Sequence, residues 1–79
     1  MITADTLRQC AYLSTPTLEK LIKENHPEDR IVTSEFLGIT NGRQFCYGIK
    51  YPDEHESGQL SQGKVFVWQN DSGKLVADY

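Results

Sequence analysis

The sequence predicts an α+β fold in which two short N-terminal helices pack on a four-stranded antiparallel β-meander. Two observations support this class. Before Pro27, apolar residues recur at three- and four-residue steps, which is the period of a helix. After Pro27, β-branched and aromatic residues dominate and glycines separate short runs, as in strands joined by tight turns. At 79 residues the chain is expected to form one domain, helical over residues 1–26 and β over residues 30–79.

The helical region should contain two helices, because Pro16 is not tolerated inside a single continuous one. Ser14 offers a capping hydroxyl, and Pro16 suits the first turn of the helix that follows. We therefore expect a first helix over residues 4–13 and a second over residues 15–25. The second helix should end before Pro27, since the residue preceding a proline is driven out of the α region.

Asn41-Gly42 is the strongest hairpin signal in the chain and predicts a two-residue turn between strands at residues 30–40 and 43–51. This turn places Phe36 opposite Tyr47. One face of the hairpin then carries most of its aromatic residues, and we expect it to lie under the helices. The expected core face of this hairpin comprises Val32, Phe36, Phe45, Tyr47, Ile49 and Tyr51, covered by the helical stripe Leu18, Leu21 and Ile22.

A second hairpin is predicted over residues 64–70 and 74–79. Its loop, Asp71-Ser72-Gly73, suits a type I turn closed by a glycine in the left-handed region. The resulting register separates Val65, Val67, Leu75, Ala77 and Tyr79 from Phe66, Trp68 and Val76. Residues 52–63, between the hairpins, contain three acids and one aliphatic side chain, so we expect a mobile loop there.

The first hairpin also has apolar residues on its other face, more than one layer of helices can cover. Strand alternation sends Ile31, Leu37 and Ile39 to the side away from the helices. This excess predicts either a sheet that closes partly into a barrel or a surface that binds a partner. We expect binding to another protein, with a homodimer as one outcome. The acids of the predicted loop, Asp53, Glu54 and Glu56, are candidate contacts for the same partner.

Residues 11–22 resemble the helix-turn-helix motif of repressors, and this resemblance implies a DNA-binding regulator as the alternative function. The motif has a small residue where its helices cross and a glycine at its turn, where this chain has Arg8 and Tyr12. The net charge is −3, and the eight Lys and Arg residues are spread singly along the chain. Because attraction to phosphates needs clustered cations, a protein partner is expected before DNA.

The sequence contains no motif typical of catalysis or cofactor binding. Neither histidine, His26 or His55, has a Ser or Cys nucleophile at a motif spacing, and no glycine run suits a phosphate. Residues 53–56 lack the spacing of a calcium loop or a zinc site, which favours a solvated acidic segment. We therefore predict a non-enzymatic accessory or regulatory protein that acts by protein binding and has no cofactor.

The two cysteines and the apolar runs predict a cytoplasmic location. Cys10 and Cys46 form no C-x-x-C pair, which favours reduced thiols over one long-range disulfide. The longest apolar run spans residues 65–68, and residues 1–5 lack a basic stretch followed by an apolar one. Both features disfavour membrane insertion and a secretory signal.

Overall fold

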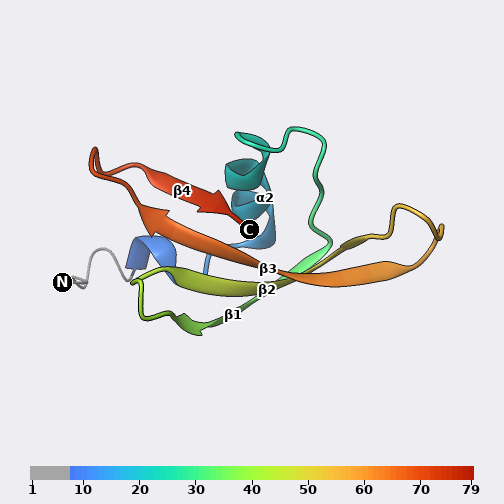
Figure 1. Cartoon of the computed structure of the whole chain (residues 1–79), viewed down its shortest axis with the longest axis horizontal. Helices are drawn as coiled ribbons and strands as arrows, with labels where there is room; N and C mark the ends of the chain where they lie inside the picture. The colour runs from blue at the N-terminus through green and yellow to red at the C-terminus, as the bar shows by residue number, and fades with distance from the viewer. Residues whose placement is uncertain (1–7) are drawn as a thin grey trace.

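The structure, a computed structural model, describes residues 8–79. These residues form two short helical segments and a four-stranded antiparallel sheet, which confirms the predicted α+β class (Figure 1). The strand order is β1-β2-β3-β4, as expected when hairpins connect neighbouring strands. The described strands form an open sheet, so the barrel-like closure that the sequence left open does not occur.

Helix α2 (Thr15–Lys23) begins where the sequence predicts and ends two residues early. Ser14 has an extended backbone, and its hydroxyl accepts the N–H of Thr17 at 3.3 Å. Pro16 lies in the first turn, where its missing N–H costs nothing. The predicted end at residue 25 is wrong because the chain already turns after Lys23 on its way to the sheet.

The first helical segment covers residues 8–10 of the described chain and ends in a turn at Tyr12, whose φ is 58°. Of the predicted helix over residues 4–13, residues 8–10 are helical and the start lies outside the described residues. The predicted end at residue 13 is wrong, because the chain already turns at Ala11 and Tyr12. Beyond the turn, the backbone N–H of Leu13 donates to the hydroxyl of Tyr47 at 3.1 Å, and that hydroxyl donates to the carbonyl of Cys10. The Tyr47 hydroxyl therefore provides a hydrogen-bond partner for a carbonyl at the end of the first helical segment and for an N–H just before α2.

Strands β1 (Thr33–Ile39) and β2 (Phe45–Pro52) form the first hairpin. The predicted two-residue turn is wrong, because the N–H of Thr40 bonds to the carbonyl of Gln44 at 2.8 Å across a three-residue loop. Arg43 closes this loop with a φ of 62°, the position that a glycine normally occupies. The loop is therefore one residue longer than the Asn-Gly signal predicts.

A β-bulge in β1 compensates for the longer loop. The register shifts between Phe36 and Gly38, so that Leu37 is an extra residue with no partner of its own on β2. Beyond the bulge, Phe36 lies opposite Tyr47, as predicted. The extra loop residue and the extra bulge residue offset each other, so the pairing from Phe36 to Thr33 keeps the predicted register. Between the bulge and the loop, the pairing is shifted by one residue.

Strand β3 (Leu60–Gln69) starts earlier than predicted. It pairs with β2 from Pro52 opposite Leu60 onwards, so the connection is limited to residues 53–59 rather than 52–63. The polar composition of residues 60–63 misled the sequence prediction, because backbone pairing with an existing strand does not require apolar side chains. Strand β4 (Leu75–Asp78) follows the loop that ends at Gly73, whose φ of 85° confirms the predicted left-handed position.

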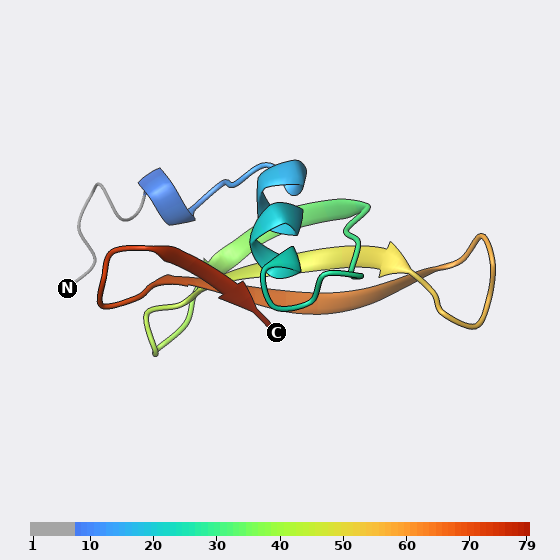
Figure 2. The ribbon, with the colours of Figure 1, turned by 90° about the horizontal axis from the view of Figure 1, so that it is seen from above.

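The core lies between the helical segments and one face of the sheet, which we call the core face (Figure 2). Leu18 and Ile22 of α2 are fully buried and Leu21 is partly buried, so the predicted helical stripe is confirmed. α2 also lies beside β4 at the edge of the sheet. The buried core comprises Cys10, Ala11, Leu18, Ile22, Ile31, Phe45, Tyr47, Ile49, Val65, Val67 and Ala77.

Candidate partner-binding face

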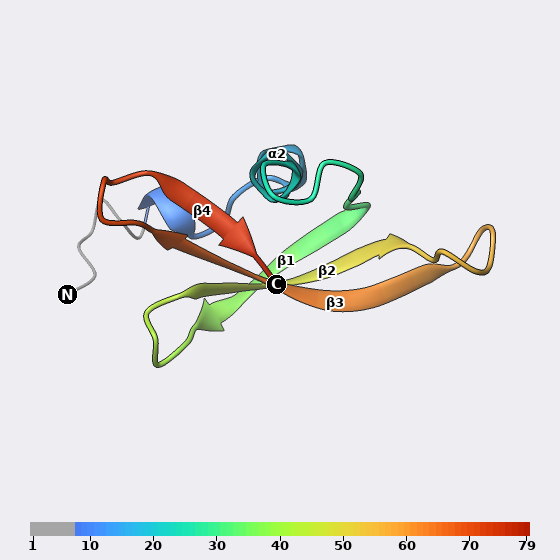
Figure 3. The same ribbon diagram turned by 45° about the horizontal axis from the view of Figure 1, so that its top comes forward.

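The other face of the sheet carries a second set of apolar side chains that no described element covers. Both helical segments lie on the opposite side (Figure 2), and the strands fan out beneath α2 when it is viewed end-on (Figure 3). Register places Cys46 opposite Phe66 and Trp68 opposite Val76 on this side. We call this surface the open face and define it by Leu37, Cys46, Phe66, Trp68 and Val76.

The bulge directs Leu37 across the open face. A Cβ added at Gly48 would lie 3.3 Å from Cδ1 of Leu37, so the leucine side chain rests over the glycine backbone. Leu37 is nevertheless 52% exposed. Phe66, Trp68 and Val76 are half-buried, and Trp68 lies directly opposite Val76. The open face thus has apolar neighbours in its own plane, but none of the described helices or strands is stacked above it.

Of the three apolar residues predicted to face outwards, only Leu37 lies on the open face. Ile31 is 7% exposed and belongs to the core, because the segment before β1 folds under α2. Ile39 lies opposite Phe45, on the side of the core face, because the bulge reverses the alternation after Phe36. Its 45% exposure comes from its position at the end of the hairpin. The predicted placement of Ile31 and Ile39 beside Leu37 is therefore wrong.

The residues that replace them, Phe66, Trp68 and Val76, come from the second hairpin. The sequence already predicted their shared face, and the structure confirms that register. Sequence reasoning missed them as site residues because it considered the first hairpin alone. A signal was present in the sequence, because Phe66 and Trp68 alternate with Val65 and Val67 and so must lie on the other face of the same strand.

The acidic candidates lie in the β2–β3 loop, far along the long hairpin from the open-face apolar row (Figure 1). Asp53 has a structural role there. One of its oxygens accepts the backbone N–H groups of His55 at 2.7 Å and Glu56 at 3.2 Å, and the other accepts the Ser61 hydroxyl at 2.9 Å. These hydrogen bonds hold the pKa of Asp53 below its ordinary value. Glu54 and Glu56 are exposed and remain predicted partner contacts.

A groove of about 460 Å³ lies on the helix side, between the segment before β1 and the long β2–β3 hairpin. Its floor is apolar and includes Ile31, Ile49 and Tyr51, and its rim carries charges of both signs. Tyr79, which also lines it, stacks on the ring of His26 with centroids 4.5 Å apart. The mixed rim gives the groove no preference for a ligand of either charge.

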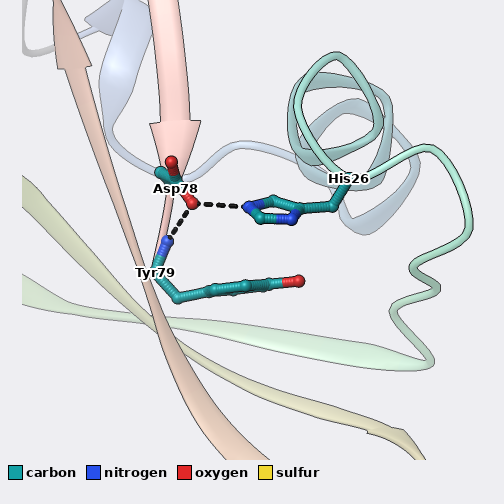
Figure 4. A network of polar contacts seen from close by, with 3 residues as sticks. All are labelled: His26, Asp78 and Tyr79. Carbon is teal, nitrogen blue, oxygen red and sulfur yellow. Dashed lines mark hydrogen bonds and ion pairs between the residues drawn. The ribbon is translucent and has the colours of Figure 1, made fainter.

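His26 is engaged in a structural contact beside this groove (Figure 4). Its Nε2 lies 2.8 Å from Oδ1 of Asp78, and the same oxygen accepts the backbone N–H of Tyr79 at 2.8 Å. The contact ties the segment after α2 to the end of β4. Among the described residues, no serine or cysteine bonds to this histidine, so the arrangement lacks an activated nucleophile.

Residues 8–79 contain no group of three or more His, Cys, Asp or Glu side chains that could hold a metal ion. Cys10 and Cys46 are both free thiols and lie on opposite sides of the sheet. Burial raises the pKa of the Cys10 thiol, which keeps it protonated and unreactive at neutral pH.

The turn before α2 matches the helix-turn-helix motif in one respect. Tyr12 adopts the left-handed conformation that the motif's glycine would supply, although a tyrosine pays strain for it. The charges around α2 do not suit DNA, because two of the lysines there are paired with acids. Nζ of Lys23 lies 3.5 Å from Oε1 of Glu19, and Nζ of Lys74 lies 3.4 Å from Oε2 of Glu24. These carboxylates reduce the attraction of the helix for phosphate.

No protein-family model, curated protein sequence or solved structure matches this chain. Within the described residues, no helix has both the length and the apolar character needed to cross a membrane.

Proposed function

We propose that the protein is a small non-enzymatic accessory module that docks another protein on its open face. The observation that carries the proposal is the uncovered apolar row across the strands, centred on Leu37, Phe66 and Trp68. Burying the remaining exposed area of such side chains stabilises a complex by about 25 cal/mol per Å². Aromatic residues, above all Trp, are also the anchors that dominate protein interfaces.

The surroundings of the open face favour a protein over a nucleic acid. Stacking of bases on Phe66 and Trp68 would need a groove of flanking cations for the phosphates. The polar end of the face instead mixes Lys50 and Lys64 with Glu35, and the whole chain has a net charge of −3. The two free thiols suit a reducing compartment, and we include a cytoplasmic location in the proposal.

The test compares three immobilised proteins in lysate from the native cell. Alongside the wild type, the Leu37→Lys/Trp68→Lys variant charges the open face, and Leu60→Lys is the matched control. Leu60 is 48% exposed in β3 but lies at the far end of the hairpin. Mass spectrometry then identifies the retained proteins, this chain included, and circular dichroism verifies the fold of each variant.

We expect a protein that the wild type and Leu60→Lys retain equally and that the double variant loses. Equal retention by all three folded proteins would place the binding elsewhere and overturn the proposal. Retention of nothing specific by any of the three would also count against it.

DNA binding is a second candidate, favoured only by the left-handed turn at Tyr12. It predicts sequence-dependent retention on duplex DNA at about 150 mM salt that is lost in Lys20→Glu. Our proposal predicts no such retention, since the chain can release few phosphate counterions.

A further inference from the structure

We propose that the partner of the open face is a second copy of this chain, docked about a two-fold axis that runs along β2. This inference rests on the proposed function above and names its partner. In a symmetric face-to-face pair, the axis lies in the plane between the two faces. Each residue on one side of the axis then meets the residue at the mirrored position in the second copy. The residues on the β1 side of β2 must therefore complement those on its β3 side.

The charges flanking β2 are complementary about this line. Glu35 on β1 and Lys64 on β3 both lie opposite Gly48, one on each side of it. Rotation about β2 brings Glu35 of each copy over Lys64 of the other and forms two equivalent ion pairs. Neither side chain has an ion-pair partner among the described residues, so both are available.

The apolar residues obey the same symmetry. The Leu37 side chain reaches from β1 over Gly48, which lies on the axis, so the rotation brings the Leu37 side chains of the two copies together. Phe66 lies on the β3 side of Cys46 and flanks this contact. Of the residues on the axis, Gly48 and Cys46 are small, and Leu37 over Gly48 fills the usual spacing of about 10 Å between packed sheets. Lys50, at the polar end of the axis, is exposed and extends its ammonium group to water.

Neighbouring strands do not offer an equivalent axis. Rotation about β3 would exchange β2 with β4 and place Cys46 over Asp78, since both lie opposite Phe66. The Asp78 carboxylate bonds to His26 on the helix side of the sheet, so it provides no contact for Cys46 on the open face. Of the two inner strands, only β2 has opposite charges at mirrored positions of the open face.

The experiment measures the dissociation constant of the purified full chain by sedimentation velocity over a range of concentrations. The variants are Glu35→Lys and Lys64→Glu, each of which gives two like-charge contacts in its own dimer. We expect the wild type to dimerise and each variant alone to bind itself about tenfold or more weakly. Glu56→Lys, a charge reversal in the distant loop, is the matched control and should dimerise like the wild type.

Mixing the two variants tests the axis itself. A heterodimer of Glu35→Lys with Lys64→Glu has two opposite-charge contacts, so the mixture should recover affinity to within about threefold of the wild type. Recovery on mixing cannot come from a folding defect, because neither variant is repaired by the other except at the interface. A dimer that is insensitive to these variants, or that mixing does not restore, would overturn the proposed axis.

A wild type that stays monomeric at all concentrations would overturn the inference as well. In that case the lysate experiment decides the proposed function separately. Retention of a different protein that depends on Leu37 and Trp68 would preserve the binding role of the open face. Loss of both results would remove the role and the dimer together.

Discussion

The two faces of the sheet have similar side chains in different surroundings. On the core face, Phe45 and Tyr47 are each 1% exposed under the helical segments. On the open face, Phe66 and Trp68 stay half-buried, and Leu37 is 52% exposed. Strand alternation gives both faces apolar residues, so composition alone does not separate them. The core face is therefore covered within the described chain and the open face is not, and we propose that another molecule covers the open face.

The largest expected effect compares the same substitution on the two faces. Leu18→Ala removes a fully buried side chain above the core face and should lower the free energy of unfolding by about 2 to 5 kcal/mol. Leu37→Ala on the open face should change it by about 0.5 kcal/mol or less. Urea melts at low protein concentration measure both values. Equal losses would mean that the open face is part of the core.

A smaller loss is expected when the polar anchor of the core face is removed. Tyr47→Phe deletes a buried hydroxyl that bonds to Leu13 and Cys10, and it should cost about 1 to 3 kcal/mol. Tyr51→Phe is the control, since the Tyr51 hydroxyl has no hydrogen bond within the described residues. Thermal melts of the two variants should differ clearly. A Tyr47→Phe melt indistinguishable from that of the control would show that these bonds add no stability.

The smallest expected effect is the loss of stability at acid pH that comes from Glu19, at the rim of the core face. Oε2 of Glu19 accepts the backbone N–H of Ile31 at 2.8 Å, and this bond, aided by Lys23, holds the Glu19 pKa below its ordinary value of 4.5. Because the folded-state pKa is the lower one, the contribution of Glu19 is present above pH 4.5 and is lost as the pH falls through the folded-state value. The side chain is 29% exposed, so we expect about 1 kcal/mol or less.

Unfolding free energies measured from pH 7 down to acid pH test this contribution. Glu19→Gln keeps an oxygen that can accept the Ile31 bond but removes the titration, so its stability should decline less steeply. Glu28→Gln removes an exposed carboxylate and serves as the control. A decline in Glu19→Gln as steep as in the wild type and the control would contradict the assignment.

Sequence patterns predicted the parts of the fold that depend on local chemistry. The cap at Ser14, the helical stripe, the strand order and the register of the second hairpin all follow from residue type and spacing. The Phe36–Tyr47 pair was also predicted, although two errors offset each other there. The three-residue loop closed by Arg43 and the bulge at Leu37 together restore the expected register.

The candidate site was harder to predict because it depends on those same irregularities. Nothing in the identity of Leu37 marks it as a bulge, and the bulge alone moves Ile39 to the other face. Ile31 becomes a core residue because the segment before β1 folds under α2, which is a tertiary effect. Likewise, residues 60–63 form a strand because β2 is long enough to pair with them.

The central claim, that the open face serves binding rather than folding, is tested most directly by one urea melt. The variant is Leu37→Lys/Trp68→Lys, followed by circular dichroism at a concentration where the wild type is monomeric. The account predicts a free energy of unfolding within about 1 kcal/mol of the wild type, since lysine side chains at the exposed position 37 and the half-buried position 68 can extend to water. A loss of about 2 kcal/mol or more, as for a core leucine, would contradict it and assign the open face to the fold.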